Sequence, residues 1–179
     1  MSDRFVLAIT GPSGSGKSTV ADRLAKQLKR CVNVDADHIK HMIVSGFSYE
    51  LKPDGTKKWN FNQWELVGDS LGLLARNFLD NSYNVIINGY LDEQAWLELQ
   101  KHVILTHKVV LLPHIDMAVK RDSERSGDLA MGKSMVEEHH DYFSNNRFYR
   151  DFVKIDSTNH NTEETVHMII DMLESQLKT

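Results

Sequence analysis

Residues 11–18 form a complete phosphate-binding motif, G-x-x-x-x-G-K-[ST], with the sequence GPSGSGKS. Its glycines let the backbone curl tightly and direct several N–H groups inward, which makes a cradle for anions at the start of a helix. Lys17 is predicted to reach the β- and γ-phosphates of a nucleotide, and the Ser18 hydroxyl to bind Mg²⁺. The motif therefore predicts a nucleoside triphosphate site built on a strand, a loop and a helix.

The residues on either side of the motif have the patterns that it requires. Residues 5–9 are a short continuous apolar run, which is typical of a strand buried on both faces. Val20, Leu24 and Leu28 recur at i, i+4 and i+8 and predict one apolar helix face. A flexible glycine-serine turn is the alternative, and this context argues against it.

Composition favours one domain in a reducing compartment. The 179 residues carry a net charge of −4, and no linker, repeat or low-complexity tract divides them, so we expect a single P-loop kinase domain over 1–179. The negative balance makes nucleic acid an improbable partner. Cys31 is the only cysteine, which excludes an internal disulfide. Without a signal peptide or an apolar run of membrane-spanning length, we expect a cytoplasmic monomer or homodimer with no membrane partner.

Five short apolar segments alternate with helical patterns. We predict strands over 4–10, 31–35, 84–88, 107–112 and 151–156. A long amphipathic helix is predicted from Trp64 to Phe78, a helix capped by Asp92 buries Trp96, and Thr162 caps a C-terminal helix. The alternation predicts an α/β fold whose parallel sheet is covered on both faces. Ligands bind beyond the carboxyl ends of such strands, so the residues that follow each strand are the candidates.

Two carboxylates follow the second predicted strand. Asp35 and Asp37 are two residues apart, so their side chains point the same way, toward the place of the γ-phosphate. Asp37 is predicted to accept the proton of a substrate hydroxyl, while Asp35 orients a Mg²⁺-bound water or holds the substrate. The alternative is that Asp37 caps a helix over residues 38–45, because aspartate is a preferred N-cap.

A basic segment follows the fourth predicted strand. Arg121 and Arg125 are spaced i, i+4 and are predicted to share a helix face, where two guanidinium groups can clamp triphosphate oxygens. Gly132 interrupts the helical pattern, as a hinged segment would. The alternative is a solvated surface helix in which Asp122 and Glu124 pair with the arginines.

Together, the loop, the Asp35-x-Asp37 pair and the two arginines resemble the small P-loop kinases of metabolites and antibiotics. That group includes gluconate kinase, shikimate kinase, the chloramphenicol phosphotransferase-like proteins and AAA-type small kinases. The resemblance spans nearly the whole chain. It implies a three-layer P-loop sandwich with a five-stranded parallel sheet in the order 2-3-1-4-5, a substrate-side region at about 38–80 and a helical lid at about 120–146.

The resemblance also assigns roles to individual residues. Asp37 matches the catalytic base, the arginines match a lid that closes over ATP, and the loop after the last strand matches the segment along the adenine ring. The predicted catalytic residues are Lys17, Asp37, Arg121 and Arg125, and the predicted metal-binding residues are Ser18 and Asp35. The predicted nucleotide-binding residues are Gly11, Pro12, Ser13, Gly14, Ser15, Gly16, Lys17, Ser18, Thr19, Arg121, Thr158 and Asn159.

The chain departs from this group at the end of the third predicted strand. Many members carry an aspartate there that helps to hold Mg²⁺, whereas this chain has Asn88. An amide can hydrogen-bond a metal-bound water but brings no negative charge. Asp92 is a substitute in principle, although its position favours an N-cap.

The segment over 46–64 has the least regular pattern, with a Pro-Asp-Gly turn at 53–55. Its aromatic residues, such as Tyr49 and Trp59, either wall an acceptor pocket or cover the core beside Trp64. The nine histidines include no set with the spacing of a transition-metal site.

The sequence thus predicts an ATP- and Mg²⁺-dependent phosphotransferase that acts on a hydroxyl of a small molecule, such as a sugar acid, another metabolite or an antibiotic. Two alternatives stay open. An ATP-binding regulatory or NTPase protein with little phosphotransfer is favoured by Asn88. A polynucleotide 5′-hydroxyl kinase is disfavoured by the negative net charge.

Overall fold

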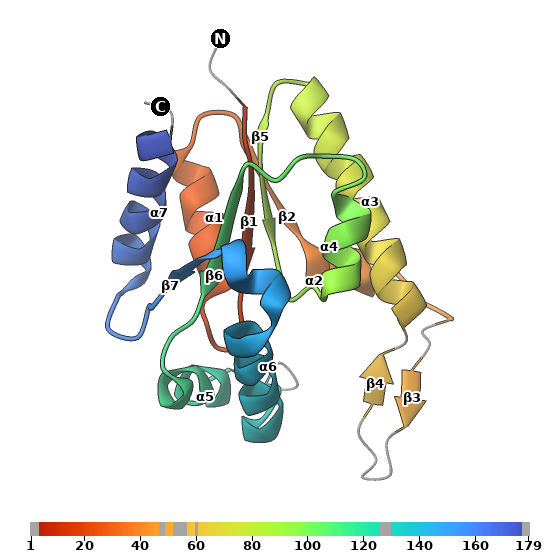
Figure 1. The fold of residues 1–179 in the computed structure, drawn as a ribbon, viewed down its shortest axis with the longest axis vertical. Coiled ribbons are helices and arrows are strands. Elements are labelled where there is room, and N and C mark those ends of the chain that lie inside the picture. Colours follow the sequence, from red (N-terminus) through yellow and green to blue (C-terminus); the bar gives the residue numbers. More distant parts are fainter. Residues whose placement is uncertain (1–3, 47–48, 52–56, 60, 126–129, 177–179) are drawn as a thin grey trace.

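The computed structural model describes residues 4–46, 49–51, 57–59, 61–125 and 130–176 (Figure 1). Of these, residues 49–51, 57–59, 61–62 and 176 are described by their backbone alone. The aromatic side chains of Tyr49 and Trp59 and the turn at 53–55, which the sequence marks as a candidate acceptor wall, therefore lie outside the described part of the chain.

A five-stranded sheet forms the centre of the molecule. Its strands are β1 (Val6–Thr10), β2 (Cys31–Asp35), β5 (Asn84–Asn88), β6 (His107–Leu111) and β7 (Val153–Ile155). All neighbours pair in parallel, in the order β2-β5-β1-β6-β7. This is the predicted order 2-3-1-4-5, and each predicted strand is confirmed to within two residues at either end.

Helices cover both faces of the sheet, which makes three layers (Figure 1). They are α1 (Lys17–Gln27), α2 (Ala36–His41), α3 (Phe61–Asp80), α4 (Glu93–Leu99), α5 (Ile115–Ser123), α6 (Lys133–Asn145), the 3₁₀ helix η2 (Arg147–Asp151) and α7 (Thr162–Gln176). Successive side chains of β1 point to opposite faces of the sheet. Val6 and Ala8 pack with α3, α4 and α6, while Leu7 and Ile9 pack with α1 and α7. The alternation explains why β1 is apolar throughout.

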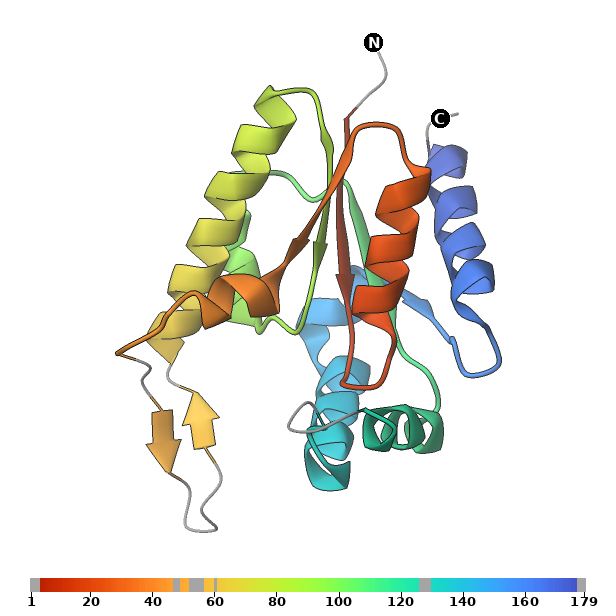
Figure 2. The same cartoon turned by 180° about the vertical axis from the view of Figure 1, so that it is seen from behind.

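The two faces are held by different kinds of packing. On the α3 and α4 side, Trp96 and Tyr149 are among the largest fully buried side chains, and they belong to one apolar cluster with Trp64. On the other side, Leu24 of α1 and Ile169 of α7 close a smaller aliphatic cluster. Figure 2 shows α1 and α7 side by side on this face.

The parallel strands end at the edge of the sheet where α5 and α6 lie (Figure 1). Both chain termini lie at the opposite edge. A two-stranded antiparallel hairpin, β3 (Tyr49–Leu51) with β4 (Lys57–Trp59), stands away from the sheet on the same side as α5 and α6. The sequence did not predict this hairpin, because each of its strands is only three residues long and shows no clear alternation.

Two predicted helix caps have different outcomes. Asp92 accepts a hydrogen bond from the Ala95 amide at 2.8 Å and begins α4, as predicted. The prediction of Thr162 as a cap is wrong, because Thr162 is already the first residue of α7. Asn161 caps this helix instead: its side chain accepts from the Glu164 amide, and the Glu164 carboxylate accepts from the Asn161 amide. This reciprocal pair is a capping box.

Within the described part of the chain, no helix is both long and apolar enough to cross a lipid bilayer.

The contact between α3 and α4 depends on Gly68, because a Cβ there would lie 2.2 Å from the carbonyl oxygen of Ala95. We expect Gly68→Ala to push the helices apart and lower the free energy of unfolding by about 2 kcal/mol, despite the better helix propensity of alanine. The midpoint of thermal unfolding should fall by about 4–8 °C. The exposed Leu73→Ala on the same helix is the matched control and should change it little. An unchanged midpoint for Gly68→Ala would contradict the close approach.

Candidate nucleotide and phosphotransfer site

The phosphate loop joins β1 to α1 and leaves the start of α1 without a side-chain cap. The N-cap is Gly16, whose φ of 87° lies in the left-handed region that favours glycine. Gly14 also has a positive φ, and a Cβ there would lie 2.0 Å from the carbonyl oxygen of Ala118 in α5. The first amides of α1 therefore stay available for an anion, and the loop is packed tightly against α5.

Lys17 is the first residue of α1 and is only 7% exposed. Its Nζ donates to the carbonyl oxygen of Pro12 at 3.2 Å, so the ammonium is folded over its own loop. Burial lowers the pKa of Lys17 from 10.5 to about 8, and the nearby carboxylates of Asp37, Asp35 and Asp122 oppose this shift. A buried cation beside an uncapped helix start is well suited to receive phosphate oxygens.

Asp35 and Asp37 have different partners. Asp35 is the last residue of β2 and the N-cap of α2, where its Oδ1 accepts from the Asp37 amide at 2.8 Å. Asp37 Oδ1 instead accepts from Nζ of Lys40 at 3.1 Å, and its side chain is 44% exposed. The interpretation of Asp37 as the cap is therefore wrong, and the helix ends at His41 rather than at residue 45. The Asp37 carboxylate is left for chemistry.

Arg121 and Arg125 meet beside the phosphate loop. Arg121 donates to the carbonyl oxygens of Ser157 and Thr158 at 3.0 and 3.4 Å. Arg125 lies beyond the end of α5 at Ser123, so the two arginines do not share a continuous helix face as predicted. Both nevertheless line one hollow of about 410 Å³. This hollow is also lined by Gly14, Ser15, Gly16, Thr19, Val20, Glu124, Ser157, His160, Asn161, Thr162 and Thr165.

The loop after β7 contributes to the hollow through other residues than those predicted. The Thr158 hydroxyl accepts from the His114 amide at 2.6 Å and donates to the Asp156 carboxylate. Both of these hydrogen bonds are made to other residues of the protein. Asn159 is exposed. The neighbouring Ser157 and His160 line the hollow in their place.

Asn88 is the last residue of β5 and lies in register with Asp35 of β2. It is fully buried, and its Nδ2 donates to Oδ1 of Asn33 at 2.7 Å. Its Oδ1 is buried, with no hydrogen-bond partner among the described residues. The edge of the sheet where the family resemblance implies a carboxylate therefore carries a neutral amide turned toward β2.

Asp122 connects the phosphate loop to the segment before α6. Its carboxylate is 1% exposed and accepts from the hydroxyl of Ser13 at 2.6 Å and from the amides of Met131 and Gly132 at 2.9 and 3.1 Å. Nε of Arg125 lies 4.0 Å from the same carboxylate. The alternative of a solvated surface helix is thereby contradicted for this residue. Spacing alone did not single out Asp122, because Ser13 lies 109 residues away in the chain.

Comparisons with known proteins agree with this geometry. Residues 6–128, more than half of the chain, match the family model described as AAA domain. The chain belongs to the AAA domain family. No curated protein matches it in sequence.

Solved structures similar to this AAA domain include two kinases and an antibiotic resistance protein. A sugar kinase from a Janibacter species is 16% identical with a TM-score of 0.72, over 96% of this chain and 95% of that chain. The tunicamycin resistance protein of Deinococcus radiodurans is 16% identical with a TM-score of 0.67, over 96% of each chain. Shikimate kinase of Acinetobacter baumannii, solved with shikimate, is 15% identical with a TM-score of 0.62, over 97% and 94%. The fold is that of the small P-loop kinases.

Two residues of this AAA domain that sequence spacing did not select lie on the other side of Lys17. Tyr90 follows β5, and the ring of His139 from α6 stacks on it with centroids 4.4 Å apart and planes 28° apart. Burial, followed by the nearby Lys17, lowers the pKa of His139 to about 4, so the imidazole is neutral at neutral pH. The sequence gives no signal for His139 beyond its place next to His140, since only the fold brings it against Tyr90.

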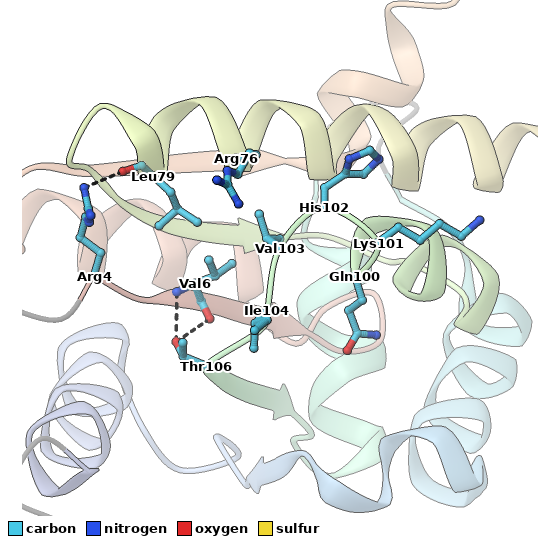
Figure 3. A pocket seen from close by; sticks show the side chains of 10 residues that line it. All are labelled: Arg4, Val6, Arg76, Leu79, Gln100, Lys101, His102, Val103, Ile104 and Thr106. Carbon is cyan, nitrogen blue, oxygen red and sulfur yellow. Dashed lines mark hydrogen bonds between the residues drawn. The ribbon is translucent and has the colours of Figure 1, made fainter.

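A second hollow, of about 330 Å³, lies at the opposite end of the sheet (Figure 3). Three cationic side chains line it, and each has a partner. Arg4 donates to the carbonyl oxygen of Leu79, Arg76 pairs with Asp80 and Lys101 pairs with Glu98. The ring of His102, which also lines the hollow, is hydrogen-bonded to Asp69. This hollow lacks the uncapped helix start and the buried cation that mark the first one.

The lowered pKa of Lys17 predicts how nucleotide affinity depends on pH. The ammonium loses its charge as the pH rises through about 8, and only the charged form attracts the triphosphate. We expect the affinity for Mg·ATP, measured by calorimetry, to fall about tenfold between pH 7 and pH 9. Lys17→Arg keeps its charge over this range, so its affinity should stay level with pH. Equal wild-type affinities at the two pH values would show that Lys17 stays charged.

Removal of the Asp122 carboxylate should destabilise the protein. Asp122→Ala leaves the buried Ser13 hydroxyl and the amides of Met131 and Gly132 without their acceptor, and we expect the free energy of unfolding to fall by about 3 kcal/mol. Urea denaturation measures this loss. The exposed Asp116→Asn on the same helix is the control, with an expected change below about 0.5 kcal/mol. Similar stabilities for the two variants would refute the bridging role of Asp122.

Proposed function

We propose that this AAA domain is an ATP- and Mg²⁺-dependent phosphotransferase that moves the γ-phosphoryl group to a hydroxyl of a small molecule. The observation that carries the proposal is that the carboxylate of Asp37, in the first turn of α2, lies close enough to the buried Lys17 to act on its pKa. In this proposal, Lys17 binds the γ-phosphate end of the triphosphate. Asp37 is the base beside the position at which an acceptor would bind. The similar folds include a sugar kinase and a shikimate kinase, which favours a small-molecule acceptor.

The residues present fit a magnesium nucleotide. The Ser18 hydroxyl is exposed in the first turn of α1 and makes no hydrogen bond to the described residues, so it is available as a hard oxygen ligand. Asp35 uses one carboxylate oxygen for its cap and keeps the other for a metal-bound water. Bound Mg²⁺ would neutralise charge on the β- and γ-phosphoryl oxygens. Among the described residues no cluster of three His, Cys, Asp or Glu side chains suits a metal ion held by the protein alone.

In the proposed reaction, the acceptor hydroxyl oxygen forms a bond to the γ-phosphorus while the bond from that phosphorus to the β–γ bridging oxygen breaks. The bridging oxygen keeps the electron pair and leaves on ADP. Asp37 accepts the hydroxyl proton, while Lys17, Arg121 and Arg125 stabilise the charge that spreads over the transferred group. Positioning and electrostatics supply most of the catalysis in such transfers. The segment over 120–146 is the proposed lid, and 38–80 the proposed substrate side.

Asn88 supports one rival function, that of an ATP-binding regulatory protein with little phosphotransfer. Its buried, neutral amide takes the place of an acidic group at the centre of the site. ADP release from Mg·ATP distinguishes the two functions. The compounds to be tested as acceptors are sugars and sugar acids, shikimate, nucleosides and hydroxyl-bearing antibiotics. Release well above the rate in water for one class supports the kinase, whereas tight ATP binding without any stimulation supports the rival.

Asp37→Asn tests the assigned base. It removes the proton acceptor but leaves the cap, which belongs to Asp35, so we expect kcat to fall by about 10²–10⁴-fold while the affinity for Mg·ATP changes little. Steady-state kinetics and calorimetry measure the two quantities. Lys17→Ala should abolish turnover and weaken ATP binding together. A fall in ATP affinity as large as the fall in kcat would show that Asp37 acts on the nucleotide rather than on the acceptor.

A further inference from the structure

Five side chains from four parts of the chain form a connected series of contacts near Lys17, which we call the acceptor wall. They are Asp37, Lys40, Trp64, Tyr90 and His139. Nζ of Lys40 lies 3.1 Å from the Asp37 carboxylate and 5.3 Å from the centre of the Trp64 ring. The Trp64 ring in turn lies 5.8 Å from that of Tyr90, which carries the stacked His139.

The backbone fixes the acceptor wall next to the proposed base. Gly89, which precedes Tyr90, has a φ of 145°, and a Cβ there would lie 2.6 Å from the Cβ of Ala36, the residue before Asp37. The other end of the wall is anchored through α6, whose Phe143 is fully buried and packs edge-on against Tyr90 at 5.5 Å. His139 therefore faces the site from a packed helix rather than from a loop.

The ring nitrogens of His139 have no hydrogen-bond partner among the described residues, although the side chain is only partly exposed. Burial and the nearby Lys17 keep the imidazole neutral, so it offers one N–H donor and one nitrogen acceptor. A hydroxyl group also donates and accepts, which makes it the natural partner of a neutral imidazole. The stacked ring gives this partner a flat apolar face as well.

The charges around the wall do not favour an anionic acceptor. The positive charge of Lys40 is offset by Asp37. Burial raises the pKa of Tyr90, together with the neighbouring Tyr142 and the carboxylates of Asp92 and Glu138. The charged groups that act on His139 are balanced, because the cations Lys17 and Lys40 are opposed by the carboxylates of Asp122 and Asp37. Among the described residues, the charges that act on His139 therefore leave no surplus positive charge for a carboxylate or phosphate on the acceptor.

We propose that the acceptor is a neutral polyhydroxylated molecule of the sugar or cyclitol type, and that His139, backed by Tyr90, binds one of its hydroxyls next to the one that reacts. This inference rests on the proposed phosphotransferase function and names the substrate class of the same site. The acceptor's ring lies along the aromatic part of the wall, and its reacting hydroxyl points to Asp37.

The test compares neutral acceptors with anionic derivatives of related structure. ADP release from Mg·ATP is measured with glucose, gluconate and glucose 6-phosphate, with ribose and ribose 5-phosphate, and with inositol and inositol phosphate. We expect one neutral compound to stimulate release at least tenfold more, as kcat/KM, than its anionic partner. Stimulation by anionic compounds alone would overturn the inference while leaving the kinase function intact.

Variants at the wall complete the test. His139→Phe keeps the stack on Tyr90 but loses both ring nitrogens, so the KM of the neutral acceptor should rise at least tenfold with little change in the affinity for Mg·ATP. The exposed His167→Phe on α7 is the matched control and should leave both unchanged. Thermal unfolding of each variant verifies its fold. An unchanged acceptor KM in folded His139→Phe would overturn the role of His139.

A flat panel in the presence of bound Mg·ATP overturns the assignment of a neutral polyhydroxylated acceptor. The proposed kinase function is then decided by ADP release with the shikimate, nucleoside and antibiotic acceptors, which are tested separately. Failure of the wild-type protein to bind Mg·ATP, or binding that Lys17→Ala leaves unchanged, would refute the proposed function itself. The two failures are therefore distinguishable.

Discussion

The buried ammonium of Lys17 is the interaction around which the site is arranged. The strand, the glycine loop and the helix fold it back over the carbonyl oxygen of Pro12, where burial makes its charge costly. Carboxylates from three elements reduce this cost without forming a direct ion pair with it, because each is held by another group. Phosphate oxygens can thus displace a single weak hydrogen bond and gain a full positive charge. The ammonium of Lys17 is therefore available to a bound anion, because no carboxylate in the described part of the chain is paired directly with it.

The carboxylate of Asp122 connects the phosphate loop to other elements of the fold, so several elements hold the loop in place. It ties the phosphate loop, through Ser13, to the amides of Met131 and Gly132 just before α6. α6 is in turn fixed to the end of β5 by Phe143 and its stack of aromatic neighbours. Direct contacts therefore connect the phosphate loop to α6, which contributes His139 to the acceptor wall. Both oxygens of this buried carboxylate accept hydrogen bonds, which favours a single arrangement of the loop and the segment before α6.

The sequence predicted the sheet because its strands are continuous apolar runs, and buried parallel strands need no other signal. The strand order followed from a family resemblance, since no local pattern specifies which strands are neighbours. The cap of α2 was misplaced by two residues because Asp35 and Asp37 are equally good caps, and only the path of the backbone distinguishes them. Asp122 and His139 were missed for a more general reason. Their partners, Ser13 and Tyr90, are distant in the chain, and propensity and periodicity carry no information about such contacts.

The site is electrostatically asymmetric, and this asymmetry is what the proposed phosphoryl transfer would require. On the donor side, Lys17, Arg121 and an uncapped helix start face a group that carries several negative charges throughout the reaction. On the acceptor side, the hydroxyl is neutral until it loses its proton, so further strong cations beside Asp37 would lower its basicity and hold back the proton transfer. A neutral His139 meets this requirement, because it can orient a hydroxyl without adding charge. The same fold can therefore supply opposite environments a few side chains apart, one from backbone amides and guanidinium groups, the other from aromatic packing.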